Sequence, residues 1–96
     1  MKVFKFGGAS VKDAEAIRNV GSILLRYEHE RVLVVVSAMG KTTNALEHIH
    51  QLWRSHHDCS IAVEEIRQFH QQLADELKID SADWHHHFAD LELRLS

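Results

Sequence analysis

The residues whose types and spacing suit anion chemistry lie in the segment KFGGASV (residues 5–11). Gly7 and Gly8 end an alternating polar and apolar run and precede a helical pattern. Glycine lets another group approach the main chain closely, and the N–H groups at a helix start attract anions. Lys5 adds a full positive charge beside the turn. The segment therefore predicts a phosphate site, with an ordinary tight strand-to-helix turn as the alternative interpretation.

A second loop rich in small and hydroxyl residues, SAMGKTTN (residues 37–44), follows an apolar run and precedes another helical pattern. Its Gly40–Lys41 pair invites comparison with a P-loop. That motif requires a glycine five positions before the Gly–Lys pair, and Val35 occupies the position. The chain also has no Gly-x-Gly-x-x-Gly dinucleotide fingerprint. Both familiar nucleotide-binding motifs are therefore excluded.

The nine histidines and the single cysteine do not form a metal-binding pattern. His48 and His50 stand two apart on a predicted helix and point to different faces. The consecutive residues 85–87 splay around another predicted helix. A structural zinc site needs four converging ligands, so no metal is predicted. Cys59 has no catalytic partner beside it and is interpreted as a structural thiol.

Apolar periodicity places a strand at residues 2–6, a helix at residues 13–27 and a second strand at residues 32–36. Ser10 and Asp13 are both good N-caps for the helix. The run VLVVV of the second strand is typical of a strand covered on both faces. Strand, helix and strand make a βαβ unit with parallel strands. Ligands of such sheets bind at the strand carboxyl ends, so the two loops should lie side by side.

The second half of the chain predicts three helices. The first spans residues 45–55, the second starts at Ser60 as its N-cap, and the last follows a cap at residues 80–81. The second helix carries an apolar stripe of Ile61, Ile66, Phe69, Leu73 and Leu77. The third carries another, of Trp84, Phe88, Leu91 and Leu95. The last stripe is expected to pack against a sister chain, and a homo-oligomer is predicted because these stripes need cover.

Bulk composition indicates one small soluble domain at most, with 96 residues, 45% of them hydrophobic and 26% charged. A net charge of -3 argues against a nucleic-acid partner. The longest apolar run, residues 32–36, is too short to cross a membrane, and the start does not read as a signal peptide. One cysteine fits a reducing compartment, so a cytoplasmic location is expected.

The two loops together resemble the start of the aspartokinases, which belong to the amino acid kinase family. The resemblance is carried by KFGGASV (residues 5–11) and VVVSAMGKTTN (residues 34–44), and it extends to EEIRQFHQQLADEL (residues 64–77). It implies an α/β fold: an N-terminal βαβ unit with parallel strands followed by three helices, as part of a carbamate kinase-like αβα sandwich without a P-loop.

The resemblance also implies an activity. Aspartokinases transfer the γ-phosphoryl group of ATP to the side-chain carboxylate of aspartate, the first step towards lysine, threonine and methionine. By resemblance, Lys5 neutralises charge on the transferring phosphoryl group and has the catalytic role. The resemblance assigns the ATP phosphates to Lys5, Gly7, Gly8 and Ser10, and aspartate to Ser37 and Thr43. Mg²⁺ would accompany the nucleotide, with its ligands outside residues 1–96.

Some features depart from the family pattern. Ala9 stands where the family often has threonine, and Met39 and Lys41 replace small residues. Residues 1–96 are expected to be a truncated part of the catalytic domain, without the nucleotide-binding half and the regulatory domains, and to be inactive alone. The alternatives are the kinase end of a bifunctional aspartokinase–homoserine dehydrogenase, a sister amino acid kinase, and a non-catalytic anion-binding or interaction module.

Overall fold

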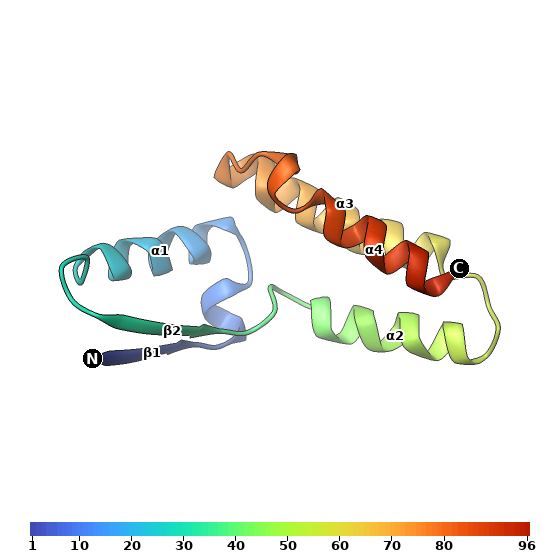
Figure 1. Cartoon of the computed structure of the whole chain (residues 1–96), viewed down its shortest axis with the longest axis horizontal. Coiled ribbons are helices and arrows are strands. Elements are labelled where there is room, and N and C mark those ends of the chain that lie inside the picture. Colours follow the sequence, from blue (N-terminus) through green and yellow to red (C-terminus); the bar gives the residue numbers. More distant parts are fainter. The chain divides into compact units, whose positions relative to one another are not determined.

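The computed structural model describes residues 1–96 and divides them into two compact units, Met1–Lys41 and Thr42–Ser96 (Figure 1). The first unit contains both strands and one α-helix, and the second is entirely helical. This mixed α/β composition, with three helices after the βαβ unit, confirms the predicted fold class.

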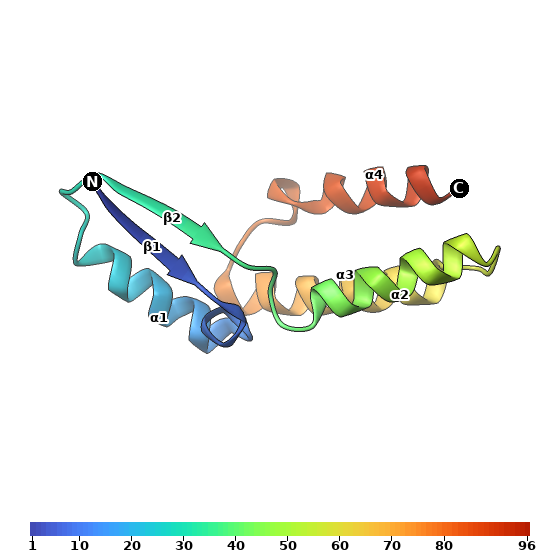
Figure 2. The same ribbon diagram turned by 90° about the horizontal axis from the view of Figure 1, so that it is seen from below.

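The first unit is built on two parallel strands, β1 (Lys2–Phe6) and β2 (Val32–Val36). They pair in register from Lys2 opposite Val32 to Phe6 opposite Val36, and Figure 2 shows both arrows pointing the same way. Parallel neighbours need a crossover connection, which the helix between them supplies. The predicted parallel βαβ unit is therefore confirmed.

Helix α1 (Ala14–Leu25) covers one face of this sheet, and the core of the unit lies between them. The buried members are Phe6, Val11 and Val20, with Phe4, Ile17, Ile23, Leu24 and Met39 packed around them. Asp13 caps the helix by accepting a hydrogen bond of 2.8 Å from the N–H of Ala16, as predicted. The prediction that Ser10 also caps it is wrong, because Ser10 lies within a separate 3₁₀ turn, η1 (Gly8–Val11).

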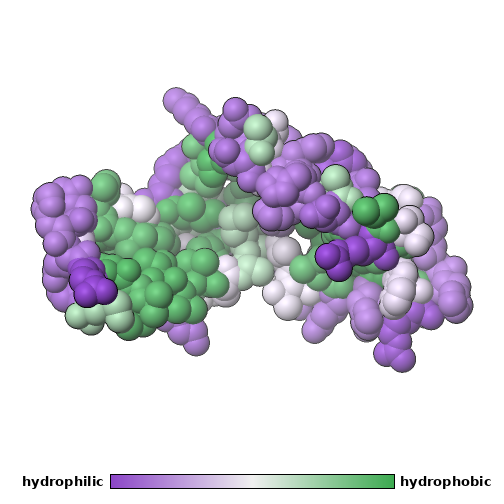
Figure 3. All heavy atoms as spheres, in the orientation of Figure 1, coloured by the Kyte–Doolittle hydropathy of each residue, from purple (hydrophilic) through white to green (hydrophobic).

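The other face of the sheet has no cover within this unit. Val3 is 61% exposed, and Leu33 and Val35 are 50% and 45% exposed. Figure 3 shows apolar atoms gathered over the unit that contains β1 and β2. The prediction that β2 is covered on both faces is therefore wrong for this chain, since α1 is the only helix of the unit and can cover only one side.

The second unit consists of α2 (Thr42–Arg54), α3 (Ser60–Leu77), the 3₁₀ turn η2 (Ser81–Asp83) and α4 (His85–Leu95). Its core is a cluster of Ile49, Val63 and Ile66, which are 2%, 3% and 5% exposed. Ile61, predicted to belong to the apolar stripe of α3, is 75% exposed. Val63 takes the core position instead, because the buried stripe of α3 runs through positions 63 and 66.

Helix α4 contributes its apolar stripe to the same cluster. Phe88, Leu91 and Leu95 pack, partly buried, against the core of Ile49, Val63 and Ile66. Trp84 lies edge-on to Phe88, with ring centroids 5.7 Å apart. The chain thus covers this stripe in part, and the packing of the stripe against a sister chain stays a prediction.

The helix starts of the second unit differ from prediction in their caps. Ser60 is the first residue of α3 and does not cap it. A carboxylate oxygen of Asp58 is the acceptor at this helix start. It accepts hydrogen bonds from the N–H of Ser60 at 3.1 Å and from the hydroxyl of Ser60 at 2.7 Å. Asp80 accepts from the N–H of Ala82 at 3.0 Å and so caps η2, not α4. Among these helices, none combines the length and apolar character needed to cross a bilayer.

Candidate functional site

The loops that follow β1 and β2 lie side by side, as predicted. The parallel ladder continues one step past the strands, because the N–H of Ser37 donates to the carbonyl oxygen of Phe6 at 3.1 Å. Further along, the N–H of Gly40 donates to the carbonyl oxygen of Val11 at 3.3 Å. Two hydrogen bonds therefore join the chain after β2 to the last residue of β1 and to the last residue of η1, on either side of the two glycines.

The glycine turn begins with extended backbone at Gly7, whose φ and ψ are -80° and -176°. Gly7 caps η1 and accepts a 3.0 Å hydrogen bond from the N–H of Ser10. The first N–H groups of such a turn have no acceptor inside it, which leaves Gly8 and Ala9 able to donate to a ligand. The helix entered from the glycines is thus a 3₁₀ turn, and α1 begins only at Ala14. The predicted helix start near Asp13 is confirmed, and the amides beside the glycines belong to the 3₁₀ turn that precedes this helix.

The space around both glycines is open. A Cβ atom added at Gly7 or Gly8 would meet no other atom within 4 Å, and neither residue has a positive φ. The packing of this chain therefore does not require glycine at either position. Glycine here leaves the main chain open to close approach by another group, as a phosphate site requires.

Lys5 stands beside the glycine turn on the uncovered face of the sheet. Side chains alternate along a strand, and Phe4 and Phe6 belong to the core under α1, so Lys5 points to the opposite side. Its side chain is exposed and forms none of the ion pairs of the chain. The ammonium group is therefore available to a ligand anion.

The two residues assigned to aspartate fall in different units. Ser37 lies directly after β2, is exposed, and donates its hydroxyl to the carbonyl oxygen of Ala38 at 3.4 Å. Thr43 is exposed in the first turn of α2, in the second unit. The first unit thus brings together Lys5, Gly7, Gly8, Ser10 and Ser37.

The sequence analysis missed the contribution of two residues in the second loop. Gly40 has a positive φ of 56°, a conformation that favours glycine, and donates the hydrogen bond to Val11. Met39 packs against the buried cluster of Phe6, Val11 and Val20. An isolated glycine between a strand and a helix is a turn signal that could have identified Gly40. Met39 was noted only as a departure from the family pattern.

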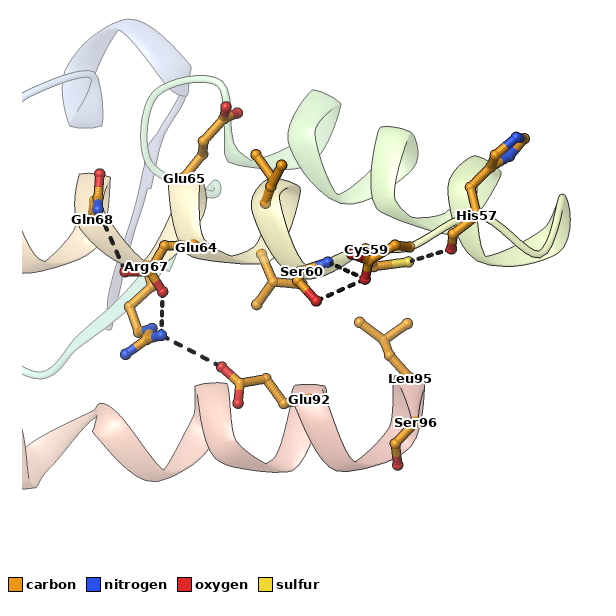
Figure 4. Close-up of a pocket in the computed structure, with 13 residues that line it drawn as sticks. His57, Cys59, Ser60, Glu64, Glu65, Arg67, Gln68, Glu92, Leu95 and Ser96 are labelled. Carbon is orange, nitrogen blue, oxygen red and sulfur yellow. Dashed lines mark hydrogen bonds and ion pairs between the residues drawn. The ribbon is translucent and has the colours of Figure 1, made fainter.

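A cleft of about 810 Å³ lies in the second unit, between the start of α3 and the end of α4 (Figure 4). Arg67 projects towards α4 and pairs with Glu64 on its own helix and, at 3.8 Å, with Glu92 of α4. Gln68 donates to Glu64 at 3.4 Å. The cleft contains none of the residues predicted for the phosphate or aspartate sites.

One carboxylate of this cleft has a perturbed acidity. The hydroxyl and N–H of Ser60 both donate to Asp58, and these hydrogen bonds lower the pKa of the Asp58 carboxyl below its ordinary value. Cys59 beside it is a free thiol whose sulfur lies 3.7 Å from the carbonyl oxygens of Ile49 and His57. No group of three or more histidine, cysteine, aspartate or glutamate side chains converges to hold a metal ion. The cleft is thus a helix-capping region with a local ion-pair network.

Comparison with known proteins identifies the relatives of this chain. Aspartokinase 2, chloroplastic, of Arabidopsis thaliana is 52% identical over 44 residues, which are 46% of this chain and 8% of that protein. Aspartokinase 3, chloroplastic, of the same plant is 35% identical over 94 residues, covering 94% of this chain and 17% of that protein. Bifunctional aspartokinase/homoserine dehydrogenase 1, chloroplastic, of Zea mays is 42% identical over 76 residues, which are 78% of this chain and 8% of that protein.

The chain spans at most 17% of the length of these curated relatives. Their names place them in chloroplasts and do not support the cytoplasmic location expected from the sequence. The sequence model of the amino acid kinase family matches residues 1–90, nearly the whole chain. The resemblance drawn from the two loops is thereby confirmed, and this chain belongs to the amino acid kinase family.

Proposed function

We propose that residues 1–96 are part of the catalytic domain of an aspartate kinase, which transfers the γ-phosphoryl group of ATP to the side-chain carboxylate of L-aspartate. The observation that carries the proposal is the pairing of the two strand ends, which holds Ser37 alongside the glycine turn through its hydrogen bond to Phe6. The relatives named as aspartokinases support the choice of aspartate as the acceptor.

In this proposal the first unit stabilises charge on the transferring phosphoryl group. Lys5 supplies a positive charge without a carboxylate partner. The open backbone at Gly7 and Gly8 lets phosphate oxygens approach the N–H groups of the turn, with Ser10 at its end. Phosphoryl transfer depends mainly on positioning and on stabilisation of charge, so a site of this composition suits the reaction.

The acceptor side of the reaction requires little from the protein. An aspartate side chain is already ionised at neutral pH, so its carboxylate attacks without a general base. Ser37 and Thr43 are proposed to orient the bound aspartate through their hydroxyl groups, which both donate and accept hydrogen bonds. Both side chains are exposed and therefore open to a ligand.

A magnesium ion would neutralise charge on the nucleotide phosphates. The residues of the glycine turn do not fit the role of its ligands, because Mg²⁺ prefers carboxylates and the nearest one along the chain, Asp13, caps α1. We therefore propose that its protein ligands come from outside residues 1–96, and that the complete nucleotide-binding half and any regulatory domains lie there too.

The proposal is tested on the full-length protein with ATP, Mg²⁺ and L-aspartate. Hydroxylamine traps an acyl phosphate as a hydroxamate and releases phosphate, so formation of aspartyl hydroxamate measures the reaction directly. The proposal predicts a product that depends on both ATP and aspartate, with L-glutamate as the matched control acceptor. Turnover with another acid and none with aspartate would instead identify a sister kinase. The 96-residue chain alone is expected to be inactive.

A second candidate is the kinase end of a bifunctional aspartokinase–homoserine dehydrogenase. It is supported by the match to the Zea mays bifunctional protein, which covers 78% of this chain. The full-length protein would then also reduce NADP⁺ in the presence of L-homoserine. Absence of that activity in a preparation with aspartate kinase activity would leave the single-function enzyme.

The assembly and location of the parent protein are also proposals. We propose a homo-oligomer, supported by apolar side chains that this chain leaves uncovered, among them Val3, Leu33 and Val35. Light scattering on the full-length protein tests this, and a monomer mass would contradict it. The names of the relatives favour a chloroplast location, which a fluorescent fusion of the full-length protein tests against the cytoplasm.

A further inference from the structure

Met39 is the one residue of the second loop whose side chain reaches the core of the first unit. Its neighbours Ala38, Gly40 and Lys41 are exposed, whereas Met39 is partly buried against the cluster of Phe6, Val11 and Val20. Val11 ends η1, the 3₁₀ turn that begins at Gly8. The Met39 side chain therefore packs against the cluster that includes Val11, the last residue of the proposed phosphate-binding turn.

A hydrogen bond lies next to this contact. The N–H of Gly40 donates to the carbonyl oxygen of Val11 at 3.3 Å, and the positive φ of Gly40 directs the chain to make it. This tie is separate from the bond between Ser37 and Phe6, which extends the parallel ladder. The ladder fixes Ser37, and the contacts of Met39 and Gly40 fix the chain that follows it.

We propose that Met39 is a positioning residue, which sets the course of the chain directly after Ser37 by keeping the N–H of Gly40 on the carbonyl oxygen of Val11. The consequence for substrate rests on the proposed function, in which Ser37 and Thr43 bind aspartate while Lys5 and the glycine turn bind ATP. Loss of the Met39 contact should then weaken aspartate binding and leave ATP binding unchanged. Leucine has a similar volume and should restore the contact.

Hydrogen exchange of the full-length protein tests whether Met39 maintains the Gly40–Val11 hydrogen bond, and it needs no enzymatic activity. In Met39→Ala the Gly40 amide should exchange on the order of tenfold faster, as expected for local opening after removal of a partly buried side chain. The Ser37 amide serves as the internal control and should stay protected, and Met39→Leu should match the wild type. Unchanged protection of Gly40 in Met39→Ala would overturn the proposal. If Met39→Ala exposes the Ser37 amide as well, Met39→Val is measured with the same two criteria.

Kinetics of the full-length protein test the consequence. Met39→Ala should raise the KM for aspartate by about tenfold or more, the scale expected for a small misplacement of binding groups, with the KM for ATP unchanged. Met39→Leu should restore the wild-type KM. Equal changes in both KM values, or no rescue by leucine, would reject the positioning role. Absence of aspartate kinase activity in the wild-type protein would instead contradict the proposed function. The exchange experiment would still show whether Met39 maintains the hydrogen bond between Gly40 and Val11.

Discussion

Lys5 of β1 lies opposite Val35 of β2, on the face of the sheet that α1 does not cover, because Phe4 and Phe6 on either side of Lys5 belong to the core under α1. The adjoining strand residues of that face are apolar and exposed, and Lys5 has no carboxylate partner there. Replacement of Lys5 should change the free energy of unfolding little, because Lys5 takes part in none of the ion pairs of the folded chain. The binding role proposed for Lys5 can therefore be tested separately from any role in stability.

Replacement of Lys5 by methionine in the full-length protein should lower kcat by about 100-fold to 1,000-fold or more, the range found for loss of one charge-stabilising group. The thermal midpoint should stay close to that of the wild type. The measurement is the hydroxamate assay together with thermal unfolding. Lys2→Met, at the far end of the same strand, is the matched control and should keep its turnover; near-normal turnover of Lys5→Met would remove Lys5 from the mechanism.

Replacement of Gly8 by alanine should weaken ATP binding in the full-length protein without loss of stability. The added methyl group meets no atom of this chain, and the smaller backbone entropy of the unfolded state should raise stability by up to about 1 kcal/mol. Titration calorimetry with ATP and urea unfolding measure the two effects. Gly21→Ala, equally open but within α1, is the control that should gain stability and bind ATP normally. Normal ATP affinity of Gly8→Ala would argue against a phosphate at this turn.

Gly40→Ala should behave in the opposite way and destabilise the first unit. Its φ of 56° is a left-handed conformation, which costs a residue with a Cβ atom about 1–2 kcal/mol. Urea unfolding followed by exchange of the amides of β1 and β2 reports this loss. Equal stability of Gly40→Ala and the wild type would mean that the loop relaxes at no cost.

Asp58→Ala should weaken the start of α3 at neutral pH and have no effect in acid. The pKa of Asp58 is lowered in the folded chain, so its stabilisation is complete above the ordinary aspartate pKa. It is lost as the pH falls through the ordinary value and then through the lower folded one. Thermal midpoints of wild type and Asp58→Ala should therefore differ at pH 7, approach each other as the pH falls below the ordinary aspartate pKa, and converge below the lowered folded pKa. A constant difference across this range would show that the charge is unimportant.

Ile49→Ala should destabilise the second unit by about 2–5 kcal/mol, as for other buried aliphatic truncations. Ile49 is 2% exposed and central to the cluster that joins α2, α3 and α4. Ile61→Ala is the matched control because its side chain is 75% exposed, and its stability should change little. Urea unfolding followed by helical circular dichroism measures both. Similar losses in the two variants would place Ile61 in the core after all.

The sequence predicted the elements of the first unit well, because each signal was local. The apolar run Val32–Val36 defines a strand by itself, and Asp13 stands where a helix pattern begins. The adjacency of the two loops followed from parallel pairing alone. Cover on β2 was mispredicted, because an apolar run indicates side chains that favour burial and does not indicate which element covers them.

The errors in the second unit have a different physical cause. Ser60 and Asp58 are both good capping residues two positions apart, and only the backbone geometry decides which oxygen meets the free N–H. Ile61 and Val63 both fit an apolar stripe, and the rotation of α3 against its neighbours selects Val63. At the site, the tie between Gly40 and Val11 joins residues far apart in sequence, so no local pattern could reveal it.

The two-stranded sheet also has a consequence for handling the chain. Each strand has one unpaired edge within the unit, and β2 offers five consecutive apolar residues without a charge or a proline along its own edge. Such an edge is a template for strand addition between copies, the first step towards cross-β aggregates. A charged gatekeeper residue such as Leu33→Lys, on the uncovered face, would keep concentrated samples dispersed while leaving the core under α1 unchanged.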